Sequence, residues 1–438
     1  MSFVTLDRRN LIHNGRAIRL RGFNVGNWLN LENFMIGLPG VDSLIRTAMR
    51  EIAGDDKCAA FFEAFTDSYF TEDDAAYIAG MGFNLLRVPF NYRLFESDQA
   101  PYRYDERGFA HLDRLLGWAK RHGLFVLLDL HAAAGGQSED WHADNPHVEP
   151  LLWSYREFQD RTTALWKVIA SRYAHDEALF GYDLLNEPNT ADAAALNAFY
   201  RRTMAAIRAV DPAHVIVLEG TRWSDDIGSL QPDLFDDPLA MPSFHHYPLF
   251  DLPAYPSTRD GVTYDRAYLA ETMANKYAFY RALERPMLFG EFGYNAGAPT
   301  DAGYRVMDDL LSLIDEQQMH WAHWSYKDVG RMGFMRVAAG TPWQAFRAAT
   351  APKNEPLAAP LAALLAAIRT AYPDALPPFQ VKMGKKFQLL LDTYALRAQM
   401  TALSAATVAE IRAMGASFRL SSCERNEAAW QVLQKHIA

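Results

Sequence analysis

The sequence predicts an α/β fold, a (β/α)8 TIM barrel with a helical C-terminal extension. Short apolar segments alternate with helical segments along most of the chain, and this alternation is typical of parallel strands joined by crossover helices. Eight such apolar segments occur, which is the number that closes this barrel. Polar residues gather where the segments end, and barrels of this kind carry their active sites at the carboxyl ends of their strands.

The totals of the chain indicate a soluble globular protein with a large core. It has 438 residues, of which 50% are hydrophobic and 22% are charged, unlike disordered or fibrous chains. α/β barrels form single units large enough to account for most of this length. The formal net charge of −10 argues against nucleic acid as a partner, because phosphate binding requires a basic surface.

The cysteines and the N-terminus indicate the cellular context. Cys58 and Cys423 are the two cysteines, and they are too far apart in sequence to suggest a disulfide framework or a zinc site. The first ten residues carry charges where a signal peptide needs an apolar core. No apolar run is long enough to span a bilayer. We therefore expect no membrane span and a cytoplasmic location, or secretion where a leader has been removed.

The expected elements follow in order along the chain. The first strand is expected at residues 17–25, followed by an insertion at about 26–70. A helix then begins after Thr71, which offers a hydroxyl cap before three acidic residues, and it ends near Gly80. The later strands are expected at 83–89, 124–131, 179–185, 215–220, 242–247, 286–293 and 321–326. The helices between them are expected at 109–122, 155–173, 192–210, 264–283 and 301–318, and the connection 219–242 lacks an obvious long helix.

The domain organisation predicted is a catalytic barrel at 1–350 and a helical extension at 351–438. The composition shifts toward alanine and proline after Gly340. Helices are expected at 361–372, 387–416 and 426–437. The extension shows no chemistry of its own, and two roles are open for it: packing on the outside of the barrel, or self-association into a homo-oligomer.

Two glutamates close apolar strands and carry the functional prediction. Glu187 follows Leu-Leu-Asn at the end of the fourth strand, and Glu291 lies in Phe-Gly-Glu-Phe-Gly at the end of the seventh. A carboxylate there is costly unless it is paired or lies in a polar cleft. These strands are nearly opposite in a closed ring, so we predict carboxyl groups about 5–5.5 Å apart, the geometry of a retaining glycosidase. The alternative is that each glutamate forms a surface ion pair.

Seven motifs occur in the order found in a known family. They are Arg-Gly-Phe-Asn-Val-Gly-Asn-Trp-Leu at 21–29, Gly-Phe-Asn-Leu-Leu-Arg-Val-Pro at 82–89, Asp-Leu-His at 129–131, Leu-Asn-Glu-Pro at 185–188, His-His-Tyr at 245–247, Phe-Gly-Glu-Phe-Gly at 289–293 and Trp-Ser-Tyr-Lys-Asp at 324–328. Together they resemble glycoside hydrolase family 5. The opening motif is most similar to the exo-β-glucanase branch, which has glycine where this chain has Asn27.

The resemblance implies a role for each matching residue. Glu187 would be the acid/base and Glu291 the nucleophile. Arg87 and Tyr247 would keep Glu291 ionised and oriented. The residues implied to contact the reacting sugar are Asn186 at its 2-hydroxyl, His131 and His245 beside it, and Trp324 as a stacking floor. The alternatives are hydrogen-bonded core histidines and a tryptophan that only packs the barrel.

Further residues are expected around this site. Trp28, Glu32 and Asn33 in the insertion are expected to contact the terminal sugar, unless the insertion is purely structural. In the loop 137–147, Trp141 is expected to stack on sugar. This loop lacks a two-histidine spacing on a helix, so we expect no metal. Lys327 and Asp328 are expected to form a local ion pair at the rim.

The function predicted is a retaining β-glycoside hydrolase that works by double displacement and needs no cofactor. A cytoplasmic location and the insertion favour exo-action on small β-glucans or β-glucosides. The alternatives are a β-mannosidase and an endo-β-glucanase. Two other classes remain: a non-catalytic carbohydrate-binding relative, and a scaffold built on the helical extension.

Overall fold

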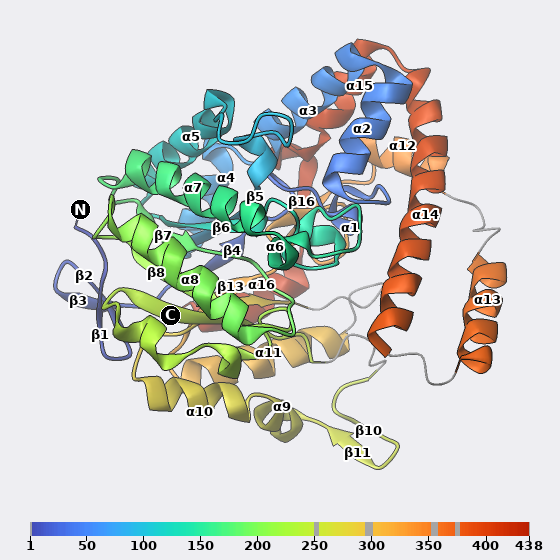
Figure 1. Cartoon of the computed structure of the whole chain (residues 1–438). Helices are drawn as coiled ribbons and strands as arrows, with labels where there is room; N and C mark the ends of the chain where they lie inside the picture. The colour runs from blue at the N-terminus through green and yellow to red at the C-terminus, as the bar shows by residue number, and fades with distance from the viewer. Residues whose placement is uncertain (1, 249–253, 294–300, 352–357, 373–376, 438) are drawn as a thin grey trace.

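The computed structural model describes residues 2–248, 254–293, 301–351, 358–372 and 377–437. Eight parallel strands close into a barrel (Figure 1). In chain order they are β4 (Arg21–Asn24), β5 (Leu85–Asn91), β6 (Phe125–Ala132), β7 (Leu179–Asp183), β8 (Val215–Glu219), β9 (Ala240–His245), β12 (Leu288–Phe292) and β13 (His320–His323). β13 pairs with β4 and completes the ring. The predicted (β/α)8 barrel is confirmed.

Helices cover the outside of the barrel. They are α4 (Glu72–Gly80), α5 (Glu106–His122), α6 (Leu151–Ser154), α7 (Arg156–Tyr173), α8 (Ala193–Arg208), α9 (Arg266–Thr272), α10 (Ala274–Leu283) and α11 (Asp301–Glu316). The start of α4 is a capping box of Thr71 and Asp74, and α5 ends at Gly123 in the left-handed conformation. Residues 220–239, all described, carry only the short 3-10 segments η3 (Ile227–Ser229) and η4 (Pro232–Asp236), as the sequence indicates.

A small antiparallel sheet closes the N-terminal end of the barrel. It consists of β1 (Thr5–Asp7), β2 (Asn10–His13) and β3 (Arg16–Ile18). Val4 and Leu11 pack with inward-facing barrel residues such as Leu127. The single first strand expected at 17–25 is therefore wrong. Its first part pairs with β2, whereas its second part, β4, pairs with β5 and β13, so the chain must turn between them.

The insertion after β4 is helical. It contains α1 (Asn33–Ile36), α2 (Asp42–Ala53) and α3 (Asp55–Tyr69). Phe61 and Phe65 on α3 pack against Trp343 and Phe418, which come from the C-terminal quarter of the chain. This aromatic contact joins the insertion to the segment that follows the barrel.

The described residues after the barrel form a three-stranded sheet and five α-helices. The strands are β14 (Lys327–Asp328), β15 (Met335–Val337) and β16 (Cys423–Arg425), and a separate hairpin, β10 (Ser257–Arg259) with β11 (Val262–Tyr264), lies earlier in the chain. The helices are α12 (Pro342–Thr350), α13 (Ala358–Ala371), α14 (Pro377–Ser404), α15 (Val408–Gly415) and α16 (Glu427–Leu433). α14 runs along the side of the molecule and α13 lies outside it (Figure 1). No helix among the described residues is long and apolar enough to cross a membrane.

Two expectations for this segment are corrected. The single helix expected at 387–416 is two helices, because Thr407 and Glu410 form a capping box that starts α15. The expected ion pair between Lys327 and Asp328 is also wrong. Lys327 is buried and donates to Asp74 Oδ1 at 2.8 Å, while Asp328 accepts hydrogen bonds from the backbone N–H groups of residues 330–333.

Candidate active site

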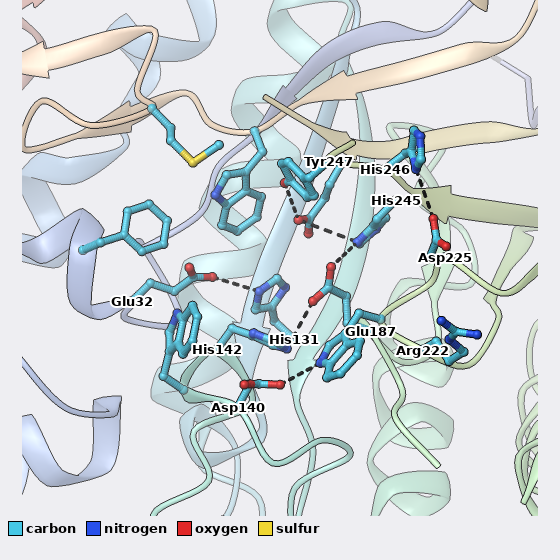
Figure 2. Close-up of a pocket in the computed structure, with 16 residues that line it drawn as sticks. Glu32, His131, Asp140, His142, Glu187, Arg222, Asp225, His245, His246 and Tyr247 are labelled. Atoms are coloured by element: carbon cyan, nitrogen blue, oxygen red, sulfur yellow. Dashed lines mark hydrogen bonds and ion pairs between the residues drawn. The ribbon is translucent and has the colours of Figure 1, made fainter. Parts of the chain in front are cut away.

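A cavity of about 510 Å³ opens at the carboxyl ends of the barrel strands (Figure 2). Eight of its lining residues are ones that the sequence singles out: Glu32, His131, Trp141, Glu187, His245, Tyr247, Glu291 and Trp324. They come from five barrel strands or the loops after them and from the insertion. Closure of the barrel brings these distant segments to one rim, as expected for this fold.

Glu291 lies on β12 and is held by two donors. Arg87 Nη1 donates to its Oε1 at 2.8 Å, and the Tyr247 hydroxyl donates to its Oε2 at 3.0 Å. Its side chain is 6% exposed, on the wall of the cavity. A guanidinium and a phenol that donate to separate oxygens fix the carboxylate in one orientation, which an attacking nucleophile needs.

Glu187 follows β7 and has a different environment. Its φ of +47° is in the left-handed region, which is uncommon for a residue other than glycine and clusters at functional sites. Its backbone N–H donates to Glu219 Oε2 at 2.7 Å, and His245 Nδ1 lies 2.8 Å from its Oε1. Burial raises the pKa of Glu187 to about 7; the hydrogen bond from His245 opposes this shift and the charge of Glu291 adds to it. Glu187 can therefore both give and take a proton near neutral pH.

The two carboxylates lie close together. One oxygen of Glu187 and one of Glu291 are within 4.8 Å of each other. Retaining glycosidases hold their carboxyl groups about 5–5.5 Å apart, and inverting ones about 6.5–9.5 Å apart, to leave room for a water. The closest approach of the two carboxylates agrees with the shorter of these separations.

Arg87 organises the floor beneath these carboxylates. It is fully buried, and its donors reach Asn24, Asp183, Asn186, Glu219 and Glu291 at 2.8–2.9 Å, with Asp129 at 3.2 Å. Burial opposes its charge, but the surrounding carboxylates, Asp129 first among them, raise the pKa of Arg87 well above its usual range. Asn186 is buried under the cavity with its Oδ1 bound to Arg87, while its Nδ2 lies 3.4 Å from His131 Nε2.

The opposite wall is built on His131. Its Nδ1 is 2.8 Å from Asp129 Oδ2, and its Nε2 is 3.0 Å from Glu32 Oε1. Burial opposes the charge on His131, but Asp129 and Glu32 raise its pKa to about 10. The Trp324 ring stacks on this imidazole, with centroids 5.4 Å apart and an interplanar angle of 9°. Glu32 and Trp324, which both line the cavity, are thus joined through His131.

Glu187, His245 and Glu291 could in principle bind a metal, because one ligand atom of each lies within 4.8 Å of the others. His245 Nε2 also lies 3.0 Å from Glu219 Oε1. Burial opposes the charge on His245, but Glu219 and Glu291 raise its pKa well above its usual range. His245 Nδ1 lies within hydrogen-bond distance of Glu187 Oε1, an arrangement that suits acid–base chemistry at Glu187.

Three residues expected to contact sugar do not line the cavity: Asn186, which is buried beneath it, and Trp28 and Asn33. Trp28 is 1% exposed in the core of the insertion, where its Nε1 donates to the Thr66 carbonyl at 2.9 Å and its ring packs near Trp118. Full burial of so large an apolar ring is favoured over a wet cavity wall. Asn33 is corrected as well: its Oδ1 accepts from the backbone N–H of Phe34 at 2.6 Å, and it is Phe34 that lines the cavity.

The sequence reasoning also missed several residues. Glu219 ends β8 just as Glu291 lies at the end of β12, so the same signal of a carboxylate closing an apolar strand could have found it. The other residues on the cavity wall do not close an apolar strand, although Asp140 and His142 lie in the loop 137–147 and His246 lies in the His-His-Tyr motif. They are Phe34, Asp140, His142, Arg222, Trp223, Asp225, His246 and Met332. Among them, His142 Nε2 lies 3.3 Å from Glu187 Oε2, and burial lowers the pKa of His142 to about 3, so it is neutral.

Known proteins are similar to this chain in sequence or in fold. Residues 54–330 match the family model described as cellulase (glycosyl hydrolase family 5). The chain is 35% identical over 354 residues to a β-xylosidase of Phanerodontia chrysosporium, covering 78% of this chain and 74% of that protein. It is 28% identical over 308 residues to endoglucanase C of Acetivibrio thermocellus, covering 61% and 87%. The crystal structure of endoglucanase Cel5A from Thermotoga maritima shares the fold, with a TM-score of 0.55 and 21% identity over 72% of this chain and 91% of that one.

Proposed function

Because the chain belongs to glycosyl hydrolase family 5, we propose that it hydrolyses β-glycosides by a retaining double displacement. The observation that carries this proposal is the pair of glutamates, whose oxygens lie within 4.8 Å of each other in unlike environments. Glu291 is held by Arg87 and Tyr247, whereas burial gives Glu187 a pKa of about 7. Such a difference between two carboxyl groups assigns the acid and the nucleophile.

The first step transfers the sugar to the enzyme. A Glu291 oxygen attacks the anomeric carbon while Glu187 gives its proton to the glycosidic oxygen, so a carbon–oxygen ester bond forms as the bond to the leaving group breaks. In the second step Glu187, now a carboxylate, takes a proton from water. The water oxygen attacks the anomeric carbon and Glu291 leaves as a carboxylate, which restores both residues.

The substrate proposed is a small β-glucan or β-glucoside cut from one end. The cavity of about 510 Å³ supports this proposal. Glu32 and Phe34 of the insertion form one of its sides. A β-mannosidase and an endo-β-glucanase remain alternatives, and the β-xylosidase relative adds β-xylosides to the substrates worth testing. A non-catalytic carbohydrate-binding protein would not need both glutamates.

The first test is a hydrolysis panel with stereochemical analysis. Aryl β-glucoside, β-xyloside, β-mannoside and β-galactoside are compared with laminari-, cello- and gentio-oligosaccharides, and proton NMR follows the anomer released first. We expect the β-anomer first and single sugars from one chain end. An α-anomer released first would refute double displacement, and internal cleavage would favour the endo-glucanase. Glu291→Gln serves as the control for contaminating activity.

We also propose a homo-oligomer formed through the C-terminal helices. Leu364 and Tyr372, in and just after α13, are 47% and 66% exposed, and Tyr394 on α14 is 66% exposed. Light scattering of the full chain and of the Tyr394→Lys variant tests this, and a monomeric full chain would contradict it.

The cytoplasmic location is likewise a proposal, which fractionation of the source cells would test.

A further inference from the structure

Helix α14 of the C-terminal extension contacts two residues of the cavity wall through Lys385. The Lys385 ammonium donates a hydrogen bond to Asp140 Oδ1, and it lies 3.2 Å from Glu139 Oε1. It also lies 5.4 Å from the centre of the Trp223 ring, which is within cation–π range. Asp140 and Trp223 both line the cavity. A helix that begins 190 positions after Glu187 thus contacts the wall of the same cavity.

Trp223 is held in an unusual backbone conformation. Arg222, Trp223 and Ser224 have consecutive φ values of +56°, +55° and +61°, in the region that residues other than glycine rarely adopt. Such conformations persist only where surrounding contacts hold them. The carbonyl of Ser224 accepts from the His245 backbone N–H at 3.2 Å, and the Trp223 Nε1 donates to Asp140 Oδ2 at 2.6 Å.

The contacts place Trp223 on the Glu187 side of the cavity. In Figure 2, Glu187 and Arg222 lie on the opposite side of the cavity from Glu32, and Asp140 lies between them at the lower edge. In the proposed reaction Glu187 protonates the leaving oxygen, so the leaving group must occupy this side. The Trp223 ring remains 37% exposed although its only polar atom is bound. It therefore offers an apolar face to whatever occupies that space.

We propose that α14 forms part of the leaving-group subsite and that Lys385 is a positioning residue, which holds Asp140 and Trp223 so that Trp223 stacks on the leaving group. This proposal rests on the proposed function and narrows its substrate class. The substrates are β-glycosides whose leaving group has a flat apolar face, such as a second pyranose ring or an aryl group. Lys385 pairs with Asp140 and lies over one face of the indole, so the loop carrying Trp223 keeps one conformation.

The test compares leaving groups of different size. We measure kcat/KM of wild type, Lys385→Met and Lys385→Arg for cellobiose, phenyl β-glucoside and β-glucosyl fluoride, in which the leaving group has no ring to stack. We expect Lys385→Met to lower kcat/KM for the first two by roughly 3- to 10-fold, mostly through KM, and to leave the fluoride unchanged. Lys385→Arg should recover most of the loss. An equal loss on all three substrates would overturn the proposal.

Lys386→Met is the matched control. Lys386 lies on the same turn of α14 and pairs with Glu149 at 3.1 Å, and Glu149 keeps a second partner in Lys382 at 2.7 Å. We expect this variant to behave as wild type on every substrate. In addition, Trp223→Ala combined with Lys385→Met should lose no more than Trp223→Ala alone, because Lys385 acts through that ring. Additive losses would overturn the positioning role.

A binding measurement separates this proposal from the proposed function. Calorimetry gives the Kd of phenyl 1-thio-β-glucoside and methyl 1-thio-β-glucoside, neither of which needs turnover. We expect Lys385→Met to weaken the phenyl compound selectively. If the protein hydrolyses nothing but this selectivity is present, the proposed function fails and the subsite stands. If the phenyl-to-methyl ratio is the same in wild type and variant, the subsite proposal fails whatever the hydrolysis results.

Discussion

In the proposed reaction, the pKa of Glu187 sets the pH range. Burial raises it to about 7, so the carboxyl group is protonated below that pH and loses its proton as the pH rises through it. The form of the free enzyme with protonated Glu187, which can protonate a leaving oxygen, therefore predominates below about pH 7 and is lost above it. At pH 9 about 1% of a group with this pKa remains protonated, so kcat/KM for a sugar leaving group should lie about 100-fold below its plateau.

The leaving group identifies the residue that titrates. A dinitrophenolate departs without a proton, so kcat/KM for a dinitrophenyl β-glucoside should not show the 100-fold fall. Glu187→Gln should abolish cleavage of a disaccharide at every pH and still react with the dinitrophenyl substrate. We would measure kcat/KM from pH 5 to 9 for both substrates with both proteins. The same alkaline fall for the two leaving groups, or its survival in Glu187→Gln, would refute the assignment.

Three further predictions concern the surrounding network. Glu291→Gln should lower turnover on the order of 1,000-fold or more with sugar binding retained by calorimetry; unchanged turnover would remove it as nucleophile. His245→Gln should move the alkaline limb of kcat/KM to higher pH, because the hydrogen bond from His245 lowers the pKa of Glu187; a shift to lower pH would contradict this. Lys327→Met should lower the free energy of unfolding by about 3–5 kcal/mol, since it leaves the buried Asp74 carboxylate without its cation. Urea unfolding with Lys386→Met as the surface control measures that loss.

Most of the fold was predictable because its signals are local. A run of apolar residues predicts a buried strand. The regular alternation of such runs with segments of helical spacing predicts a parallel sheet. The misplaced boundaries have local reasons too. Residues 17–25 resemble one strand because both halves of this segment are apolar enough for a strand. The two halves become separate strands only because they pair with two different sheets. The helical spacing across 387–416 likewise hides the cap at Thr407.

The candidate site was predictable where a residue's place on a strand decides its place in space. In a closed parallel barrel every strand ends at the same rim, so Glu187 and Glu291 had to meet there. The insertion follows no such rule. Trp28 precedes a turn of the chain and Asn33 follows it, and the sequence does not reveal which way that turn runs. The turn places Glu32 at the cavity, but it does not place Trp28 or Asn33 there.

The sequence by itself determined the barrel, the family and the two carboxylates, because periodicity and strand order are properties of neighbouring residues. Only the tertiary structure decided the rest. The pKa of Glu187 depends on burial and on the charges of His245 and Glu291, which arrive from other strands. The contact between Lys385 and Asp140 joins residues 245 positions apart, on a helix that carries no catalytic motif. Such contacts follow from packing of whole elements, which no local pattern encodes.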